Sequence, residues 1–252
     1  YKVPFTPSLG LSWQALSGEN WVLNMSENIS QSYRVPTFND RFWMPGGNPD
    51  LKPERGMNYE WGARWSYTDG NVSGNIKLNA FFMNINDWIL WKNGGSFWYA
   101  ENVENMVSQG IEFMTGWKFD LFHLPFSTGV NYTLTSTQRV KSLNETNAID
   151  RQMEYVPKHS GNFFVNTSWK KLVLGVDGTY TGEQYTDEED KNVLNPYFLL
   201  NMNASYEVKI DAKNKVLLSG MIQNMLNTSY QSSWGYAMPG ISYRISLTYQ
   251  FN

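Results

Sequence analysis

Apolar and polar residues alternate along most of the chain. The last segment is the clearest case: one side carries Ile241, Tyr243, Ile245, Leu247, Tyr249 and Phe251, and the polar residues lie between them. Successive side chains of a strand point to opposite faces, so this pattern predicts strands with one apolar and one polar face. It recurs at 57–67 and 200–210 and, more weakly, at 8–16, 21–33, 72–85, 107–119, 126–136, 161–170, 172–182 and 215–224. We therefore expect an all-β chain of about eleven strands, many long enough to cross a bilayer at a tilt.

Short and long connections alternate between these strands. The short ones fall at 17–20, 68–71, 120–125, 170–171 and 211–214, and the long ones near 34–55, 86–106, 137–160, 183–196 and 225–240. Every second connection of an antiparallel barrel lies on the same side of the membrane, and bacterial outer-membrane barrels have short periplasmic turns and long external loops. The sequence thus predicts an antiparallel transmembrane β-barrel whose long loops face outside the cell.

Composition supports a barrel over other membrane folds. Aromatic residues make up 16% of the chain, yet the mean hydropathy is only −0.47. No stretch approaches the roughly eighteen apolar residues of a membrane helix, which excludes an α-helical membrane protein. Barrel strands are apolar on one face only, so we expect the apolar faces to meet lipid and the polar faces to line the lumen. Rings near strand ends would form interfacial girdles: Trp21, Tyr67, Trp117, Phe119, Trp169, Tyr249 and Phe251. The alternative, a water-soluble aromatic core, would leave too many polar faces to cover.

Other global features limit the function classes. The chain has no cysteine, which excludes disulfides and thiol chemistry, and its net charge of −3 shows no basic stripe for nucleic acid. It starts at Tyr1 without the charged and apolar regions of a signal peptide, so we expect a piece of a longer protein. Bacterial single-chain barrels have an even number of strands, so a piece of about eleven should not close alone.

Several motifs resemble those of TonB-dependent receptors. Residues 33–39 read YRVPTFN and residues 48–54 read NPDLKPE, which is similar to the family's external-loop motif, F/Y-R-x-P followed by N-P-x-L-x-P-E. Asn58-Tyr59-Glu60-Trp61-Gly62 and Val107-Ser108-Gln109-Gly110-Ile111-Glu112 resemble its strand motifs. Residues 222–230 and 239–243 resemble the segments before its terminal strand. The chain departs from the pattern at Met225-Leu226 and by ending in Asn252.

This resemblance covers essentially the whole chain and carries specific expectations. It implies a 22-stranded outer-membrane barrel, of which residues 1–252 form about the last eleven strands. The plug domain, the TonB box and the N-terminal strands would lie upstream. The family imports large, scarce nutrients with energy transmitted by TonB. We therefore expect an integral protein of the Gram-negative outer membrane whose partners are outer-membrane lipid, the TonB complex and a large nutrient.

The absence of a histidine from one loop narrows the range of possible ligands. Haem receptors of the family usually carry a His between the two loop motifs, and none lies between Pro36 and Asn48. Imidazole is a common axial ligand of haem iron, so haem is disfavoured. His123 falls in a predicted periplasmic turn, and His159 reads as a polar residue at a strand end. Cobalamin and ferric siderophores are equally expected, and an oligosaccharide remains an alternative.

Candidate ligand-binding residues are aromatic or basic residues of the long loops: Arg41, Phe42, Trp43, Trp91, Phe97, Trp98, Tyr99, Tyr185, Trp234 and Tyr236. Rings offer broad contact at a low entropy cost, which suits a bulky, rigid ligand. For each of them, packing within the loop or anchoring at the interface is the competing interpretation.

No catalytic, cofactor or resident metal site is expected. The sequence contains no G-x-S-x-G, H-E-x-x-H or phosphate-binding glycine motif, and its two histidines are predicted on opposite sides of the membrane. The acidic run Asp187-Glu188-Glu189-Asp190 lacks the spaced ligands of a calcium loop, and we interpret it as a solvated loop or as a loop bridged through divalent ions to lipopolysaccharide. A porin or an adhesin barrel is the remaining rival to a receptor.

Overall fold

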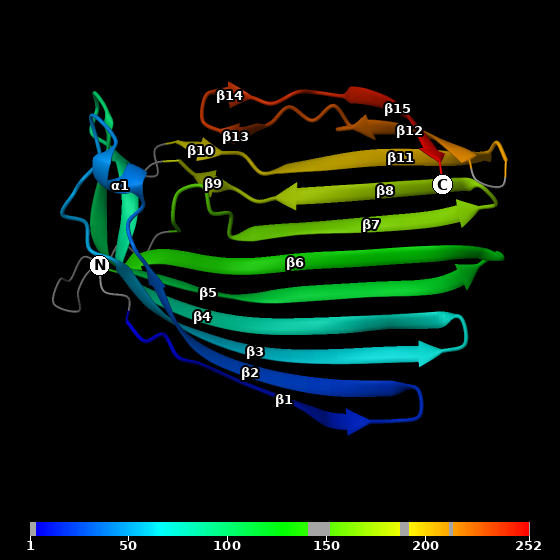
Figure 1. Cartoon of the computed structure of the whole chain (residues 1–252), viewed down its shortest axis with the longest axis horizontal. Helices are drawn as coiled ribbons and strands as arrows, with labels where there is room; N and C mark the ends of the chain where they lie inside the picture. The colour runs from blue at the N-terminus through cyan, green and yellow to red at the C-terminus, as the bar shows by residue number, and fades with distance from the viewer. Residues whose placement is uncertain (1–3, 141–151, 187–191, 212–213, 252) are drawn as a thin grey trace.

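A computed structural model describes residues 4–140, 152–186, 192–211 and 214–251. Its main feature is one antiparallel sheet of eleven strands (Figure 1). In sheet order these are β1 (Ser8–Ser17), β2 (Trp21–Arg34), β3 (Glu54–Asp69), β4 (Val72–Asn93), β5 (Trp98–Leu121), β6 (Leu124–Val140), β7 (His159–Trp169), β8 (Leu172–Thr181), β11 (Tyr197–Lys209), β12 (Asn214–Gln223) and β15 (Ser242–Phe251). The predicted all-β class and the strand count of about eleven are confirmed.

The predicted sorting of the connections is also confirmed, except for the connection between β4 and β5. In Figure 1 the tight turns lie at the right-hand end of the sheet and the long connections at the left-hand end. The β5–β6 turn consists of Phe122 and His123, and both have positive φ, at 52° and 61°. Two such residues form the turn type whose twist matches a hairpin. Consecutive strands are neighbours throughout the sheet, apart from the two small hairpins described below.

The long connections contain short elements of their own. Helix α1 (Phe38–Phe42) lies between β2 and β3. Two small hairpins, β9 (Gln184–Tyr185) with β10 (Val193–Leu194) and β13 (Gln231–Ser233) with β14 (Tyr236–Ala237), lie in later connections. Within the described residues, the structure has no helix that is both long and apolar enough to span a membrane.

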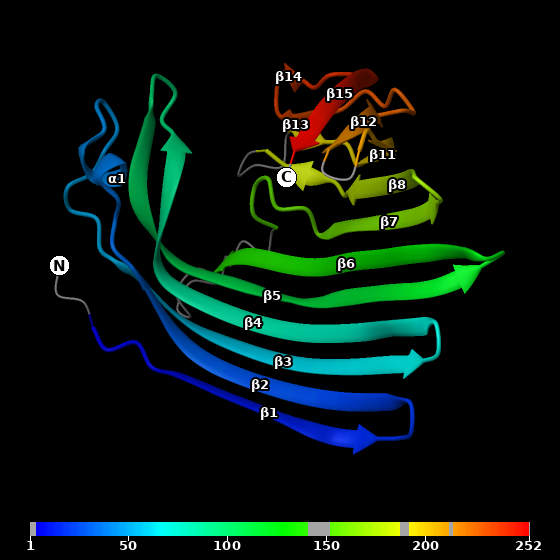
Figure 2. The ribbon, with the colours of Figure 1, turned by 45° about the vertical axis from the view of Figure 1, so that its right-hand side comes forward.

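Two expectations about the connections were wrong. The segment 86–106 was predicted as one long loop, but β4 and β5 keep pairing with each other as far as Asn93 and Trp98. A loop of only residues 94–97 joins them, and this hairpin projects beyond the end of the sheet (Figure 2). The long connection near 34–55 was also expected to form a loop without a helix, yet α1 forms there. At five residues it is too short to show a repeat, and a capping box made by Thr37 and Asp40 begins it.

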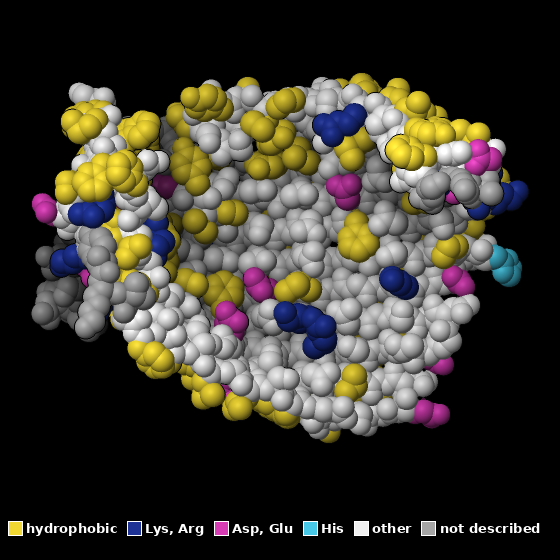
Figure 3. All heavy atoms as spheres, in the orientation of Figure 1, with side chains coloured by type: hydrophobic (Ala, Val, Ile, Leu, Met, Phe, Trp, Pro, Cys, Tyr) yellow, Lys and Arg dark blue, Asp and Glu magenta, His cyan; other side chains and the backbone are white. Residues whose placement is uncertain are grey.

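The sheet is curved, and its two faces differ as the alternation predicted. The face shown in Figure 3 is hollowed; it carries charged side chains across its middle, and hydrophobic side chains gather at its rims. We call this the inner face and the opposite one the outer face. Apolar side chains of the outer face are widely exposed, for example Ile245 at 80% and Leu247 at 71%.

Strand register gives a residue-level view of the outer face. One row of paired residues runs from Glu27 on β2 through Trp61, Ala80, Ile111 and Leu134 to His159 on β7. In the described strands, Glu27 is the one acidic or basic side chain in the middle of this face. The indole Nε1 of Trp61 donates a hydrogen bond to its Oε1 at 3.3 Å.

Hydrophobic cores form at the long-connection end. One cluster comprises Leu51, Ile89 and Ala100, with Trp91 packed against it. Another comprises Ile85, Met106 and Met153, and Met153 comes from the connection between β6 and β7. The most deeply buried apolar residues therefore hold the connections in place above the sheet.

Candidate functional site

The β2–β3 connection and the β4–β5 hairpin pack together into one unit. Leu51 of the connection, 2% exposed, packs with Ile89 and Ala100 of the hairpin. The backbone N–H of Ala100 donates to the carbonyl of Gly46 at 2.8 Å. We call this unit, residues 37–52 and 88–102, the platform. In both ribbon views it turns across the end of the curved sheet (Figures 1 and 2).

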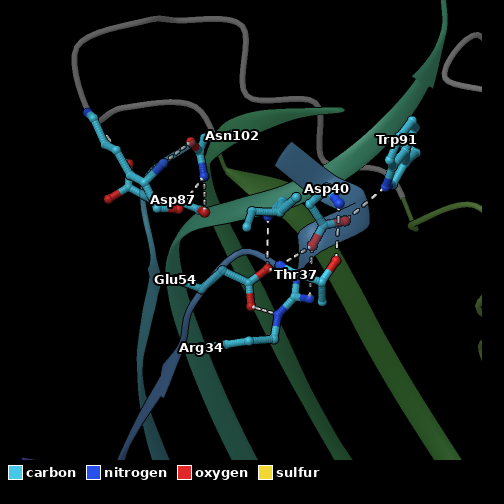
Figure 4. Close-up of polar contacts among 9 residues, drawn as sticks. Arg34, Thr37, Asp40, Glu54, Asp87, Trp91 and Asn102 are labelled. Carbon is cyan, nitrogen blue, oxygen red and sulfur yellow. Dashed lines mark hydrogen bonds and ion pairs between the residues drawn. The ribbon is translucent and has the colours of Figure 1, made fainter. Parts of the chain in front are cut away.

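A polar network joins the platform to the wall of the sheet (Figure 4). Arg34, at the end of β2, binds both carboxylate oxygens of Glu54, the first residue of β3, and its Nε lies 2.5 Å from Oε2. Glu54 is 5% exposed. Its Oε1 also accepts the backbone N–H of Ile89 at 2.9 Å. The register of β3 with β4 ends at Asn86, so Glu54 takes the place of a strand partner for Ile89.

Asp40 extends this network into α1. Its Oδ2 accepts the backbone N–H of Thr37 at 2.8 Å, and its Oδ1 accepts the indole N–H of Trp91 at 3.0 Å. The guanidinium of Arg34 lies 3.8 Å from Oδ2. Burial of Asp40 raises the pKa of its carboxyl, but the hydrogen bonds from Thr37 and Trp91 and the charge of Arg34 outweigh burial and leave that pKa below its ordinary value. Asp40 is therefore held as a carboxylate.

A second contact set fixes the other end of the platform. The side-chain amide of Asn102 accepts the N–H of Lys52 at 2.8 Å and donates to the carbonyl of Lys52 at 3.0 Å. It also donates to the carbonyl of Asp87 at 2.6 Å. Asp87 has a φ of 56°, an uncommon backbone conformation for a residue with a side chain. It lies where the hairpin extends past the end of β3, and Asn102 stabilises that point.

Seven of the ten candidate ligand-binding residues lie in the platform: Arg41, Phe42, Trp43, Trp91, Phe97, Trp98 and Tyr99. Trp91 is half-buried and engaged by Asp40, so it supports the platform. Phe42, Trp43, Phe97 and Trp98 are 45–57% exposed. The guanidinium of Arg41 donates to the carbonyl of Pro49 and lies 4.9 Å from the ring centre of Phe42. The sequence placed these residues in two loops, and the structure brings those loops together.

The remaining three candidates lie elsewhere at the same end of the sheet. Tyr185 is in β9, where its carbonyl accepts the N–H of Tyr155 at 2.8 Å. Trp234 lies in the β13–β14 turn and Tyr236 in β14, and they are 51% and 73% exposed. Whether any of the ten residues contacts a ligand stays a prediction.

Sequence reasoning missed the polar network. Arg34 and Glu54 belong to the motifs on which the resemblance rests, and Thr37 and Asp40 have the spacing of a helix cap, but we assigned none of them a role. The acidic run 187–190 lies outside the described residues. Among those that the structure describes, no group of three or more acidic or histidine side chains could hold a metal ion. His159 begins β7, as expected, and its Nδ1 lies 2.7 Å from the hydroxyl of Tyr132.

Comparison with known proteins decides the family. The family model described as TonB dependent receptor-like, beta-barrel matches residues 3–225. The chain belongs to the TonB-dependent receptor family. Members of this family are receptors and transporters rather than enzymes; they bind large nutrients and TonB, and the homologues are outer-membrane β-barrels.

Several curated relatives are vitamin B12 transporters. The chain is 28% identical over 249 residues to the vitamin B12 transporter BtuB of Photobacterium profundum, and 26% identical over 241 residues to that of Vibrio vulnificus. These alignments cover 95% and 92% of this chain but 38% and 36% of the relatives. The chain thus spans well under half of their length.

Solved structures of receptors show the same fold. The ferric-catecholate import receptor Fiu of Escherichia coli K12 aligns with a TM-score of 0.66 at 16% identity, covering 97% of this chain and 34% of Fiu. The copper transporter OprC aligns with a TM-score of 0.70 at 13% identity, covering 93% of this chain and 37% of OprC. Their cargoes differ, so this likeness concerns the barrel fold alone.

Proposed function

We propose that this chain forms the C-terminal barrel strands of an outer-membrane receptor that imports cobalamin or a ferric siderophore with energy from TonB. The plug domain, the TonB box and the remaining strands would lie upstream of residue 1. The chain itself would supply part of the barrel wall and the platform and would carry out no chemical reaction. Family membership and the names of the relatives support this proposal.

The observation that carries the ligand proposal is the packing of two separate connections into one unit that bears four exposed aromatic rings. Phe42 and Trp43 come from the β2–β3 connection, and Phe97 and Trp98 from the β4–β5 hairpin. All four rings stay exposed although the platform has its own buried core. Exposed rings gathered on a surface are typical of a binding site, and they suit a large rigid ligand.

Calorimetry on the intact receptor tests the ligand class. The panel is cyanocobalamin, several ferric siderophores, haemin and a maltooligosaccharide. We expect binding of cyanocobalamin or one siderophore, and a loss of tenfold or more in affinity for Trp43→Ala and Trp98→Ala. Tyr243→Ala is the matched control, because Tyr243 is 71% exposed but lies on the outer face of β15. Binding of haemin alone or of the oligosaccharide alone would refute the proposed cargo.

Uptake by whole cells tests the energy source. Cells that lack other receptors and express the intact receptor should take up the bound ligand, and deletion of tonB should abolish that uptake. Equal uptake in both strains would indicate a passive porin. Residues 1–252 expressed alone should restore no uptake, because the proposed plug and the other strands are missing. Restoration by this piece would overturn the domain assignment.

A further inference from the structure

The platform is held together by more than its small apolar core. Two carboxylates that connect it, Asp40 and Glu54, are 7% and 5% exposed. Replacing a buried ionic network by apolar residues of similar size is often neutral or stabilising, so such a network is weak evidence for stability. Its effect is geometric: a carboxylate with several donors fixes all of its neighbours at once. Here those neighbours belong to β2, the β2–β3 connection and β4.

Asp40 and Trp91 make a direct side-chain link between the two parts of the platform. Asp40 belongs to α1, and the exposed stretch with Phe42 and Trp43 begins at the last residue of that helix. Trp91 belongs to β4, near the hairpin tip that carries Phe97 and Trp98. The hydrogen bond from the indole N–H to Oδ1 measures 3.0 Å, and the ring of Trp91 packs on the core of Leu51, Ile89 and Ala100. This link adds a side-chain hydrogen bond to the core of Leu51, Ile89 and Ala100 and to the backbone bond from Ala100 to Gly46.

We propose that Asp40 and Trp91 are positioning residues for ligand capture. They hold the pair Phe42 and Trp43 in a fixed relation to the pair Phe97 and Trp98, so that the free receptor already presents one assembled surface. This inference rests on the proposed function, because it concerns how the same aromatic surface is formed. A receptor whose two connections moved independently would present that surface only part of the time, and its apparent affinity would fall by that fraction.

The test uses Asp40→Asn, Trp91→Phe and the double variant in the intact receptor, with whichever ligand of the panel the wild type binds. Asparagine keeps the shape of Asp40 but replaces one acceptor oxygen with a donor. Phenylalanine keeps a ring in the core but lacks the indole N–H. Glu101→Gln is the matched control: Glu101 pairs with Lys92 at 2.5 Å, and both residues of this ion pair belong to the hairpin.

We expect each single variant to weaken binding about tenfold, mainly through a slower association rate, because fewer molecules are competent at any time. The double variant should lose little more than either single one, since both remove the same link. Glu101→Gln should stay within about twofold of the wild type. The midpoint of barrel melting in detergent should not change, which separates positioning from general stability. Trp43→Ala, which removes a contact, should instead raise the dissociation rate.

Results other than these would contradict either the positioning role or the proposed function. Unchanged affinity in both single variants, additive losses, or losses carried by the dissociation rate would refute the positioning role while leaving the proposed function intact. A wild-type receptor that binds no member of the panel would refute the proposed cargo instead. If Asp40→Asn fails to assemble, Trp91→Phe decides the question by the same association-rate criterion.

Discussion

An arginine scan across the sheet tests which face meets lipid. Ala63 lies on the outer face of β3, between Met25 of β2 and Leu78 of β4. It is about six residues from the turn end of β3, or ~20 Å along the strand at ~3.3 Å per residue. At a tilt of about 40° this corresponds to a height of ~15 Å, close to the middle of an apolar band that is about 25 Å tall. Ala63→Arg removes little packing, so its cost reports the charge.

We expect Ala63→Arg to lower the unfolding free energy of the intact receptor by about 2–4 kcal/mol. This is a factor of roughly 30 to 900 in the folding equilibrium. The measurement is a denaturant titration of receptor that refolds reversibly into lipid vesicles. Asn79→Arg is the matched inner-face control. The amide Nδ2 of Asn79 lies 3.2 Å from Oε2 of Glu112, so an arginine there gains a carboxylate neighbour, and we expect a cost below about 1 kcal/mol.

Equal costs at Ala63 and Asn79 would refute the assignment of the two faces, and so would a larger cost at Asn79. Gly62, the inner-face neighbour of Ala63, is a poor control. A Cβ atom at Gly62 would press on the hydroxyl of Ser26, and steric strain would then add to any effect of the charge.

Three further predictions follow from single contacts. Docking of the platform should weaken in acid, because the pKa of Asp40 is lowered. The stabilising contribution of this carboxylate is complete above its ordinary pKa near 3.8 and is lost as the pH falls through the lowered value. Amide exchange at Thr37, whose N–H donates to Asp40, would report the loss. Glu27→Leu should raise the unfolding free energy in lipid by about 1 kcal/mol, because a carboxylate leaves the middle of the outer face; a decrease would mean that the hydrogen bond from Trp61 outweighs the cost of placing that carboxylate in lipid. Gly110→Ala should lower the melting midpoint, at a cost of about 1–3 kcal/mol, because its Cβ would meet the carbonyl of Leu134 and the ring of Phe81. Gly220→Ala, whose Cβ has no neighbour within 4 Å, should not.

Sequence alone predicted the wall of the sheet well, because most strands keep one apolar face with a period of two. The sequence did not predict where the β4–β5 hairpin ends, and the reason is physical. Beyond Asp87, β4 and β5 pair only with each other, and the pattern that reports one buried face is lost. Trp88, Ile89 and Trp91 instead serve the local cores. Alternation therefore marks where a strand lies in the sheet, rather than where it ends.

The candidate site was predicted in its parts but not in its assembly. We selected the aromatic residues of the long loops as candidates, and this selection included the exposed Trp43 and Trp98. It could not indicate that Trp91 supports the platform, because the sequence does not show that Asp40 lies beside it. The network depends on pairs far apart in the chain, such as Arg34 with Glu54 and Asp40 with Trp91. Single-sequence periodicity carries no information about such pairs.

The register of the sheet also determines the slope of its strands. One row of paired residues starts at Trp21, at the turn end of β2, and reaches Ile222 on β12 eight strands later. Ile222 lies about eight residues from Asn214, which is at the turn end of β12. The row has therefore moved about eight residues away from the turn end of the sheet over eight strands. A stagger of about one residue per strand, with ~3.3 Å per residue and ~4.8 Å between strands, tilts the strands by roughly 35°, as in outer-membrane barrels. Residues in one row of paired residues therefore lie at successively different depths in the membrane. This is why the row that holds Glu27 in the middle of the outer face reaches the rim at His159.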